Sequence, residues 1–161
     1  MQQEFEMSFL GELTYFLGLQ VQQNKYGIFL SQTKYLKQLL KRYKMEDSKP
    51  VSTPMVKGCS LISNDESATI HQPTYKSMIG SQIYLTSTWL DIMHAVGIVG
   101  RFQENPKESH LKEVKRISKY LQWTHNFALW YPKDANLTLH SYIDTYAEKT
   151  LVVVHYICLP G

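Results

Sequence analysis

The chain has 161 residues, which is enough for one domain or for two small subdomains that share a core. Hydrophobic residues make up 43% and charged residues 19%, so the composition supports a packed core and excludes wholesale disorder. The longest apolar run, 151–159, is too short to span a bilayer, and the first residues lack the pattern of a secretory signal. Cys59 and Cys158 show no spacing typical of a disulfide framework or a zinc site. We therefore expect an intracellular protein without membrane contact, and the compartment stays open.

The net charge of +3 is unevenly distributed along the chain. Residues 1–24 carry three Glu and neither Lys nor Arg, whereas residues 25–57 carry seven Lys and one Arg against one Glu and one Asp. A second basic segment, 101–119, holds four Lys and two Arg against three Glu. Two basic segments indicate either a phosphate-binding surface or solvated helix faces, and composition leaves both interpretations open.

The first third of the chain predicts a β-hairpin followed by a helix. Residues 14–22 and 28–30 have the density of apolar residues typical of strands, and turn residues at 24–27 separate them. Residues 32–44 follow helical periodicity, and Ser31 is expected to be the N-cap. The apolar face of this helix is formed by Tyr35, Leu36, Leu39, Leu40 and Tyr43.

The rest of the chain predicts a long loop, three further helices and a second hairpin. Residues 45–73 are rich in Pro and small polar residues, which favours a long connection. Helical patterns follow over 75–84, over 92–102 after Ser87 or Thr88, and over 111–121 after Asn105-Pro106. Strand-like segments at 127–131 and 137–143 flank a turn at 132–136, and another begins at Thr150. The predicted fold class is α+β.

Short blocks of this sequence, in order and at their spacing, resemble one family. The blocks are Leu10–Gly18, Gly27–Tyr35, Lys49–Met55, Tyr75–Ser81, Tyr84–Thr86, Asp91-Ile92, Ala95–Gly97, Lys115–Leu121, Leu129–Tyr131 and Tyr142–Asp144. Together they are similar to the C-terminal part of the copia-type retrotransposon reverse transcriptase, over about residues 5–147. The sequence departs from this family at Trp89-Leu90, where the family usually has Arg-Pro, and after Asp144.

The resemblance implies a division of the chain and a set of nucleic-acid contacts. Residues 1–31 would end the palm with a primer-grip-like hairpin, 32–125 would form thumb and connection helices with a long loop at 45–73, and 126–161 would be the truncated start of an RNase H-like sheet. The hairpin contacts would come from Phe16, Leu17 and Gly18. Phosphate contacts would come from Lys34, Lys37, Lys41, Arg42, Lys115, Arg116 and Lys119. Without the resemblance, Gly18 also fits an ordinary turn glycine, and the Lys and Arg residues also fit solvated helix faces.

Asp144 is the candidate for catalytic chemistry. The resemblance places it where RNase H has the first of its metal-binding acids, although two-metal hydrolysis needs several converging carboxylates and only Glu148 follows. A strand-end acid without this role is the alternative. The polymerase acids are also missing, because these 161 residues contain no adjacent Asp-Asp pair. Dispersed His residues give no local metal site.

The sequence therefore predicts a fragment of an RNA-directed DNA polymerase that contacts an RNA–DNA or DNA duplex without sequence preference. We expect no activity and no cofactor for the chain alone, with Mg²⁺ and the upstream palm and fingers belonging to the intact enzyme. One alternative is a non-enzymatic remnant or interaction module without nucleic-acid activity. Another is one exon of a longer active enzyme.

Overall fold

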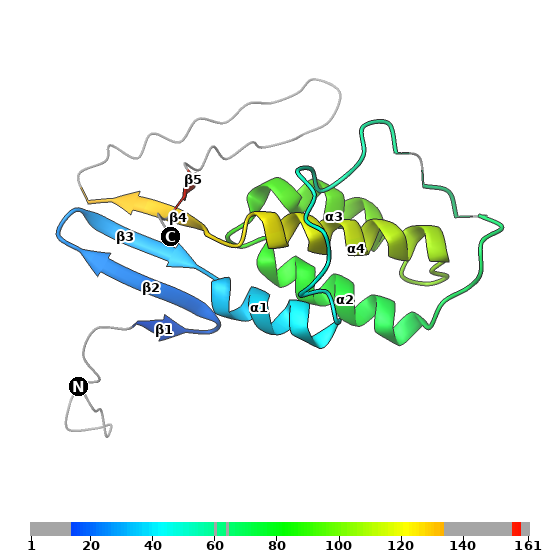
Figure 1. Ribbon diagram of the computed structural model, residues 1–161, viewed down its shortest axis with the longest axis horizontal. Helices are drawn as coiled ribbons and strands as arrows, with labels where there is room; N and C mark the ends of the chain where they lie inside the picture. The colour runs from blue at the N-terminus through cyan, green and yellow to red at the C-terminus, as the bar shows by residue number, and fades with distance from the viewer. Residues whose placement is uncertain (1–13, 60, 64, 134–155, 159–161) are drawn as a thin grey trace, which may run out of the picture.

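The computed structural model describes residues 14–59, 61–63, 65–133 and 156–158, and within them the fold is α+β, as predicted. A sheet forms one end of the molecule and a bundle of helices the other (Figure 1). The strands are β1 Tyr15–Phe16, β2 Leu19–Asn24, β3 Gly27–Ser31, β4 Phe127–Pro132 and β5 Tyr156–Cys158. The helices are α1 Thr33–Arg42, α2 Gln72–Leu85, the short 3₁₀ helix η1 Leu90–Ile92, α3 Met93–Gly100 and α4 Glu108–Trp123.

The predicted N-terminal hairpin is confirmed as β2 and β3. Its turn is held by the Asn24 side chain, whose Oδ1 accepts hydrogen bonds from the backbone N–H groups of Tyr26 (2.8 Å) and Gly27 (3.1 Å). Only glycine fits at position 27, because an added Cβ would lie 2.3 Å from the carbonyl oxygen of Tyr131. The close approach of β3 to β4 at this end of the sheet therefore depends on a residue without a side chain.

The strand predicted at 127–131 forms as β4, but its neighbour differs from the prediction. The sequence predicts that this strand forms a separate C-terminal hairpin with residues 137–143, which lie outside the described residues. In the structure β4 pairs antiparallel with β3, and the strand order of the sheet is β1-β2-β3-β4-β5. The N-terminal hairpin and β4 thus share one sheet, because the return of the chain along α4 brings residue 127 back to the start of α1 (Figure 1).

All four described α-helices contribute to one hydrophobic core. The expected apolar faces of α1 and α4 contribute to this core. The sequence predicts a thumb-like helix beside a small three-helix subdomain, whereas in the structure α1 packs in the same core as α2, α3 and α4. The largest fully buried side chain is that of Trp89, one of the two residues that depart from the family pattern. Its Nε1 donates a hydrogen bond to Thr124 Oγ1 at 3.1 Å, so this residue links the turn after α2 to the end of α4.

The helix starts differ from the prediction at two caps. Ser31 ends β3 and pairs with Gln20, so Gln32 takes the N-cap position of α1. For α4 the N-cap is Lys107 and not Asn105, because the His110 ring accepts the Lys107 backbone N–H through Nδ1 at 3.1 Å. At α1 the start is decided by a partner distant in sequence, Gln20 of β2, and at α4 by a side chain of the first helical turn, His110.

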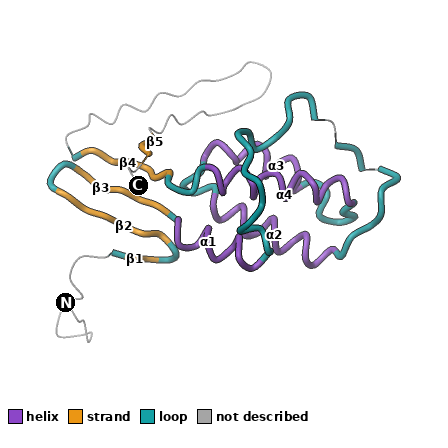
Figure 2. Tube along the Cα trace, viewed as in Figure 1, coloured by secondary structure: helices purple, strands orange, loops and turns teal. Residues whose placement is uncertain are grey.

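The long connection predicted at 45–73 lies between α1 and α2, at residues 43–71, and runs antiparallel along α4 (Figure 2). Near the end of α4, Ser48 Oγ donates to Gln122 at 2.9 Å; near its start, the backbone N–H of Glu108 donates to the carbonyl of Ala68 at 2.9 Å. Between them, His110 Nε2 donates to the carbonyl of Ile62 at 3.0 Å. The Ala68 and Ile62 carbonyls thus find hydrogen-bond donors on α4, and the Ser48 bond fixes the other end of the connection to the same helix.

Sheet and bundle meet at a buried polar joint built around Gln32. Its side chain is fully buried, its Nε2 donates to the carbonyl of Tyr84 at 3.3 Å, and its Oε1 accepts from Thr88 Oγ1 at 2.7 Å and Ser87 Oγ at 3.2 Å. Next to it, Thr33 Oγ1 donates to the carbonyl of His125 at 3.0 Å. Ser87 and Thr88, predicted as helix caps, serve this joint instead.

We predict that Gln32→Leu lowers the free energy of unfolding by about 2–4 kcal/mol. It keeps the volume but removes the acceptor of the buried Thr88 hydroxyl and the Gln32 hydrogen bond to the Tyr84 carbonyl, which then keeps only its bond from Ser87 Oγ. Urea unfolding followed by circular dichroism measures the change. Gln38→Leu, at an exposed position of the same helix, is the matched control and should change stability by no more than about 0.5 kcal/mol. Equal effects of the two substitutions would contradict a structural role for the joint.

Candidate nucleic-acid interface

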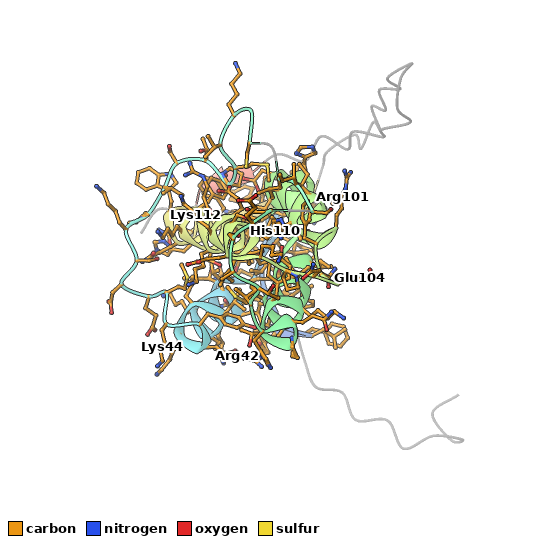
Figure 3. The ribbon with its side chains drawn as sticks, turned by 90° about the vertical axis from the view of Figure 1, so that its right-hand side faces the viewer. Arg42, Lys44, Arg101, Glu104, His110 and Lys112 are labelled. Carbon is orange, nitrogen blue, oxygen red and sulfur yellow. The ribbon has the colours of Figure 1, made fainter. Side chains whose placement is uncertain are left out.

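The predicted phosphate-contacting residues of α1 lie on its outer face. Lys34, Lys37, Lys41 and Arg42 are all exposed, while Leu36, Leu39 and Leu40 of the same helix are buried in the core. Lys34, Lys37 and Lys41 follow a three-then-four spacing, which places them along one side of the helix over about 10 Å. In Figure 3, which looks at the bundle from the end opposite the sheet, Arg42 and Lys44 lie at the lower edge beside α1.

The second predicted element, Phe16-Leu17-Gly18, is the turn between β1 and β2. Phe16 pairs with Leu19, and the two turn residues have positive φ, 48° for Leu17 and 80° for Gly18, as a two-residue hairpin turn of this hand requires. Phe16 is 53% and Leu17 71% exposed. A leucine in the left-handed region is strained, and here it also presents its apolar side chain to solvent.

The tip of this turn is held against the helices. An added Cβ on Gly18 would lie 2.6 Å from Tyr84 Oη, so the turn backbone touches α2. The Tyr84 ring in turn meets Tyr35 of α1 edge to face at 4.8 Å between centroids. The exposed tip therefore has a fixed position relative to α1.

The tip and the lysine face of α1 meet at Lys34. The Lys34 backbone N–H donates to Gln20 Oε1 at 2.8 Å, and the Lys34 Nζ lies 5.1 Å from the centroid of the Tyr15 ring. Tyr15 is 45% exposed and lines, with Lys34 and residues of β2, an open hollow of about 550 Å³. Tyr15 is not among the contact residues predicted from the sequence, although its place one residue before Phe16 in a strand-like segment was an available signal. The structure thus combines lysines and exposed aromatic residues in one surface, which we call the α1 surface: Tyr15, Phe16, Leu17, Lys34, Lys37, Lys41 and Arg42.

The basic residues of α4 do not join the α1 surface in the same way. Lys115 is exposed and Lys119 partly buried, but Arg116 is engaged with the α1–α2 connection, where its Nη2 donates to Thr53 Oγ1 at 2.9 Å. Burial, and then the Glu113 carboxylate, raise the pKa of the nearby Cys59 thiol, while Arg116 lowers it. The Arg116 side chain is therefore used in a contact within the protein. The phosphate contacts of Lys115, Arg116 and Lys119 stay a prediction.

Asp144, the predicted vestigial RNase H acid, lies outside the described residues. In the part of the chain that the structure does describe, no group of three or more His, Cys, Asp or Glu side chains is placed to hold a metal ion. The described residues therefore do not fit the magnesium centre of a polymerase. None of the described helices is both long and apolar enough to cross a membrane.

Residues 1–57 match the protein family described as reverse transcriptase (RNA-dependent DNA polymerase). This segment contains the whole α1 surface and the hairpin that leads into it. No solved structure matches the chain.

Relatives extend the match over most of the chain. It is 37% identical over 142 residues to the retrovirus-related Pol polyprotein from transposon RE1 of Arabidopsis thaliana, which covers 88% of this chain and 10% of the relative. It is 36% identical to the mitochondrial protein AtMg00810 of the same plant, over 88% of this chain and 58% of the relative, and 36% identical to the Pol polyprotein from transposon TNT 1-94 of Nicotiana tabacum, over 74% and 10%. The chain belongs to the copia-type reverse transcriptase family of retrotransposon Pol polyproteins, and it spans about a tenth of the length of those polyproteins.

We predict opposite effects on stability for alanine at two glycines. Gly18→Ala should lower the free energy of unfolding by about 1–2 kcal/mol, because φ is 80° there and the new Cβ meets Tyr84. Gly97→Ala should raise it by up to about 1 kcal/mol, because among the described residues nothing lies within 4 Å of its added Cβ and alanine favours the helix. Thermal unfolding of both variants checks the pair. A loss of stability in both would argue against the turn geometry as the cause.

Proposed function

We propose that this chain is the part of a reverse transcriptase that holds the template–primer duplex while another part of the polyprotein adds nucleotides. The observation that carries the proposal is the α1 surface, where exposed lysines on one helix face adjoin an exposed aromatic turn. Family membership supports it, because the segment matching the reverse transcriptase family includes this surface.

The chemistry of the α1 surface fits binding without sequence preference. Lysine ammonium groups contact phosphates, which carry no base information. Lys34, Lys37 and Lys41 span about 10 Å of helix, which matches the rise of about three phosphates of one strand along a duplex axis, at about 3.4 Å each. The fixed turn at Phe16-Leu17 supplies an apolar contact beside this row, suited to the sugar and base at a strand end.

The division into subdomains belongs to the same proposal. Residues 1–31 would end the palm, 32–125 would form the thumb and connection, and 126–161 would begin an RNase H-like part. The two proposed boundaries fall at the β3–α1 and α4–β4 junctions, which the Gln32 joint holds together. Polymerase chemistry would be supplied by acids elsewhere in a longer polyprotein, since no adjacent Asp pair occurs in these 161 residues.

A module that binds protein and not nucleic acid is the second candidate. Its support is an apolar hollow of about 430 Å³ between α2 and α3, bordered by the exposed side chains of Ile83 and Met93. The hollow presents Arg101 at its rim and little else that a phosphate would bind. Binding measurements on the α1 surface separate the two candidates.

We predict that Lys37→Ala/Lys41→Ala weakens binding to a mixed-sequence primer–template duplex on the order of tenfold at low salt, because two phosphate contacts are lost. The slope of log affinity against log salt should decrease in magnitude by about 1.8. Fluorescence anisotropy over a range of salt concentrations measures both quantities.

Lys57→Ala/Lys76→Ala is the control, since it removes the same charge from two exposed lysines outside the α1 surface. It should retain more of the affinity and the wild-type slope. Equal losses in both double variants would indicate general charge attraction and would reject the α1 surface as the binding face.

We also expect the purified chain to extend no primer in the presence of Mg²⁺, because the polymerase carboxylates would lie in another part of the polyprotein. A gel assay with labelled primer tests this. Any template-dependent product would contradict the proposed division of labour.

A further inference from the structure

A second surface with the same chemical character lies at the far end of the sheet. A hollow of about 560 Å³ opens there on one sheet face. Its floor is a row of side chains across three strands, because Gln23 pairs with Ile28 and Ile28 pairs with Tyr131. Tyr131 is 41% exposed, so part of its ring is free to contact another molecule.

Two lysines from distant parts of the sequence stand at the rim of this hollow. Lys25 lies in the β2–β3 turn, and Lys133 follows β4 directly. They are brought together by the backbone, since the Lys133 N–H donates to the carbonyl of Tyr26 at 2.8 Å. Among the described residues that line the hollow there is no Asp or Glu, so neither lysine has a carboxylate partner in its lining. The hollow therefore has a positive rim and a partly apolar floor.

The floor is held rigidly from behind. On the opposite sheet face Trp130 packs on Phe29 with ring centroids 4.1 Å apart, and a Cβ on Gly27 would lie 2.6 Å from the Trp130 ring. This packing fixes the backbone of β4 on both sides of Tyr131. An aromatic ring that is already held in place loses little entropy on binding.

We infer that this hollow binds a nucleotide of single-stranded nucleic acid. The base stacks on Tyr131 beside Ile28, Lys25 and Lys133 bind the flanking phosphates, and the Gln23 amide offers a donor and an acceptor to the base edge. A single strand is required because stacking on a side chain needs an unpaired base, whereas a duplex presents only its phosphates to such a hollow.

This site shares no residue with the α1 surface, although Gln23 also lines the hollow formed by Tyr15 and Lys34. β3 leads from Gly27 at the hollow to Ser31 before α1, a distance of four residue steps or about 14 Å. A strand that leaves a duplex held at α1 could reach the hollow over this distance, a step that rests on the proposed function. Binding of a single strand at the hollow does not rest on it.

The test is fluorescence anisotropy of the full chain with a labelled oligothymidine of about 12 nucleotides, within the usual site sizes of single-strand binders. We expect Tyr131→Ala to weaken binding about fivefold or more, and Tyr131→Phe, which keeps the ring, to bind as the wild type does. Lys25→Ala/Lys133→Ala should weaken binding and reduce the magnitude of the salt slope by about 1.4. Lys57→Ala/Lys76→Ala is again the charge-matched control.

Wild-type binding by Tyr131→Ala would overturn the inference, because no base would then stack at the hollow. So would equal losses in the two lysine double variants. The α1 variant Lys37→Ala/Lys41→Ala separates this result from the proposed function: it should weaken duplex binding and leave oligothymidine binding nearly unchanged. If it abolishes oligothymidine binding while the hollow variants do not, the single strand binds at α1 and the inference fails.

Discussion

The buried amide of Gln32 determines how the two halves of the molecule meet. A neutral amide without solvent contact must find all its partners inside the protein, and this one finds them in the carbonyl of Tyr84 and the hydroxyls of Ser87 and Thr88. The amide thereby ties the start of α1 to the end of α2. Since β3 runs into α1 and α4 runs into β4, the same place also fixes the angle at which the sheet leaves the bundle. An apolar residue here would fill the space but would not specify this arrangement.

The contacts around Gln32 also position the residues of the α1 surface. The β1–β2 turn rests on Tyr84, whose carbonyl accepts the Gln32 hydrogen bond, and Lys34 begins the lysine row two residues after Gln32. The strained Leu17 turn and the lysine face are therefore placed by one set of contacts, although they come from different elements. At the other end of the sheet, Gly27 allows the close approach of β3 and β4 that brings Lys25 and Lys133 to the rim of one hollow. The hairpin β2–β3 thus connects two surfaces of lysine and aromatic side chains.

The α1–α2 connection shows how a segment without helix or strand becomes part of the core. It follows α4 and exchanges hydrogen bonds with both ends of that helix. His110 has a central part, because its ring caps α4 through Lys107, bonds the connection at Ile62 and stacks on Phe102 at 4.0 Å. One consequence is that Arg116, a free basic residue by its sequence pattern, becomes a contact of the connection.

Local pattern by itself determined the β2–β3 hairpin, through its turn residues, and the four helical segments, because burial of one face every 3.6 residues leaves a recognisable spacing. The apolar faces of α1 and α4 followed from that spacing, whereas Ile83 and Tyr84, expected on the apolar face of α2, are exposed. The exposed lysines of α1 followed from the same pattern, as the residues opposite Leu36 and Leu40. The resemblance in short blocks was enough to indicate the family. The tertiary structure decided the rest: that β4 pairs with β3, that α1 shares the core of α2–α4, that Ser31 ends a strand and does not cap a helix, and that Tyr15 and Tyr131 stand beside lysines. These facts depend on contacts between residues far apart in the chain. The spacing of residues along the sequence does not show which distant residue each of them contacts.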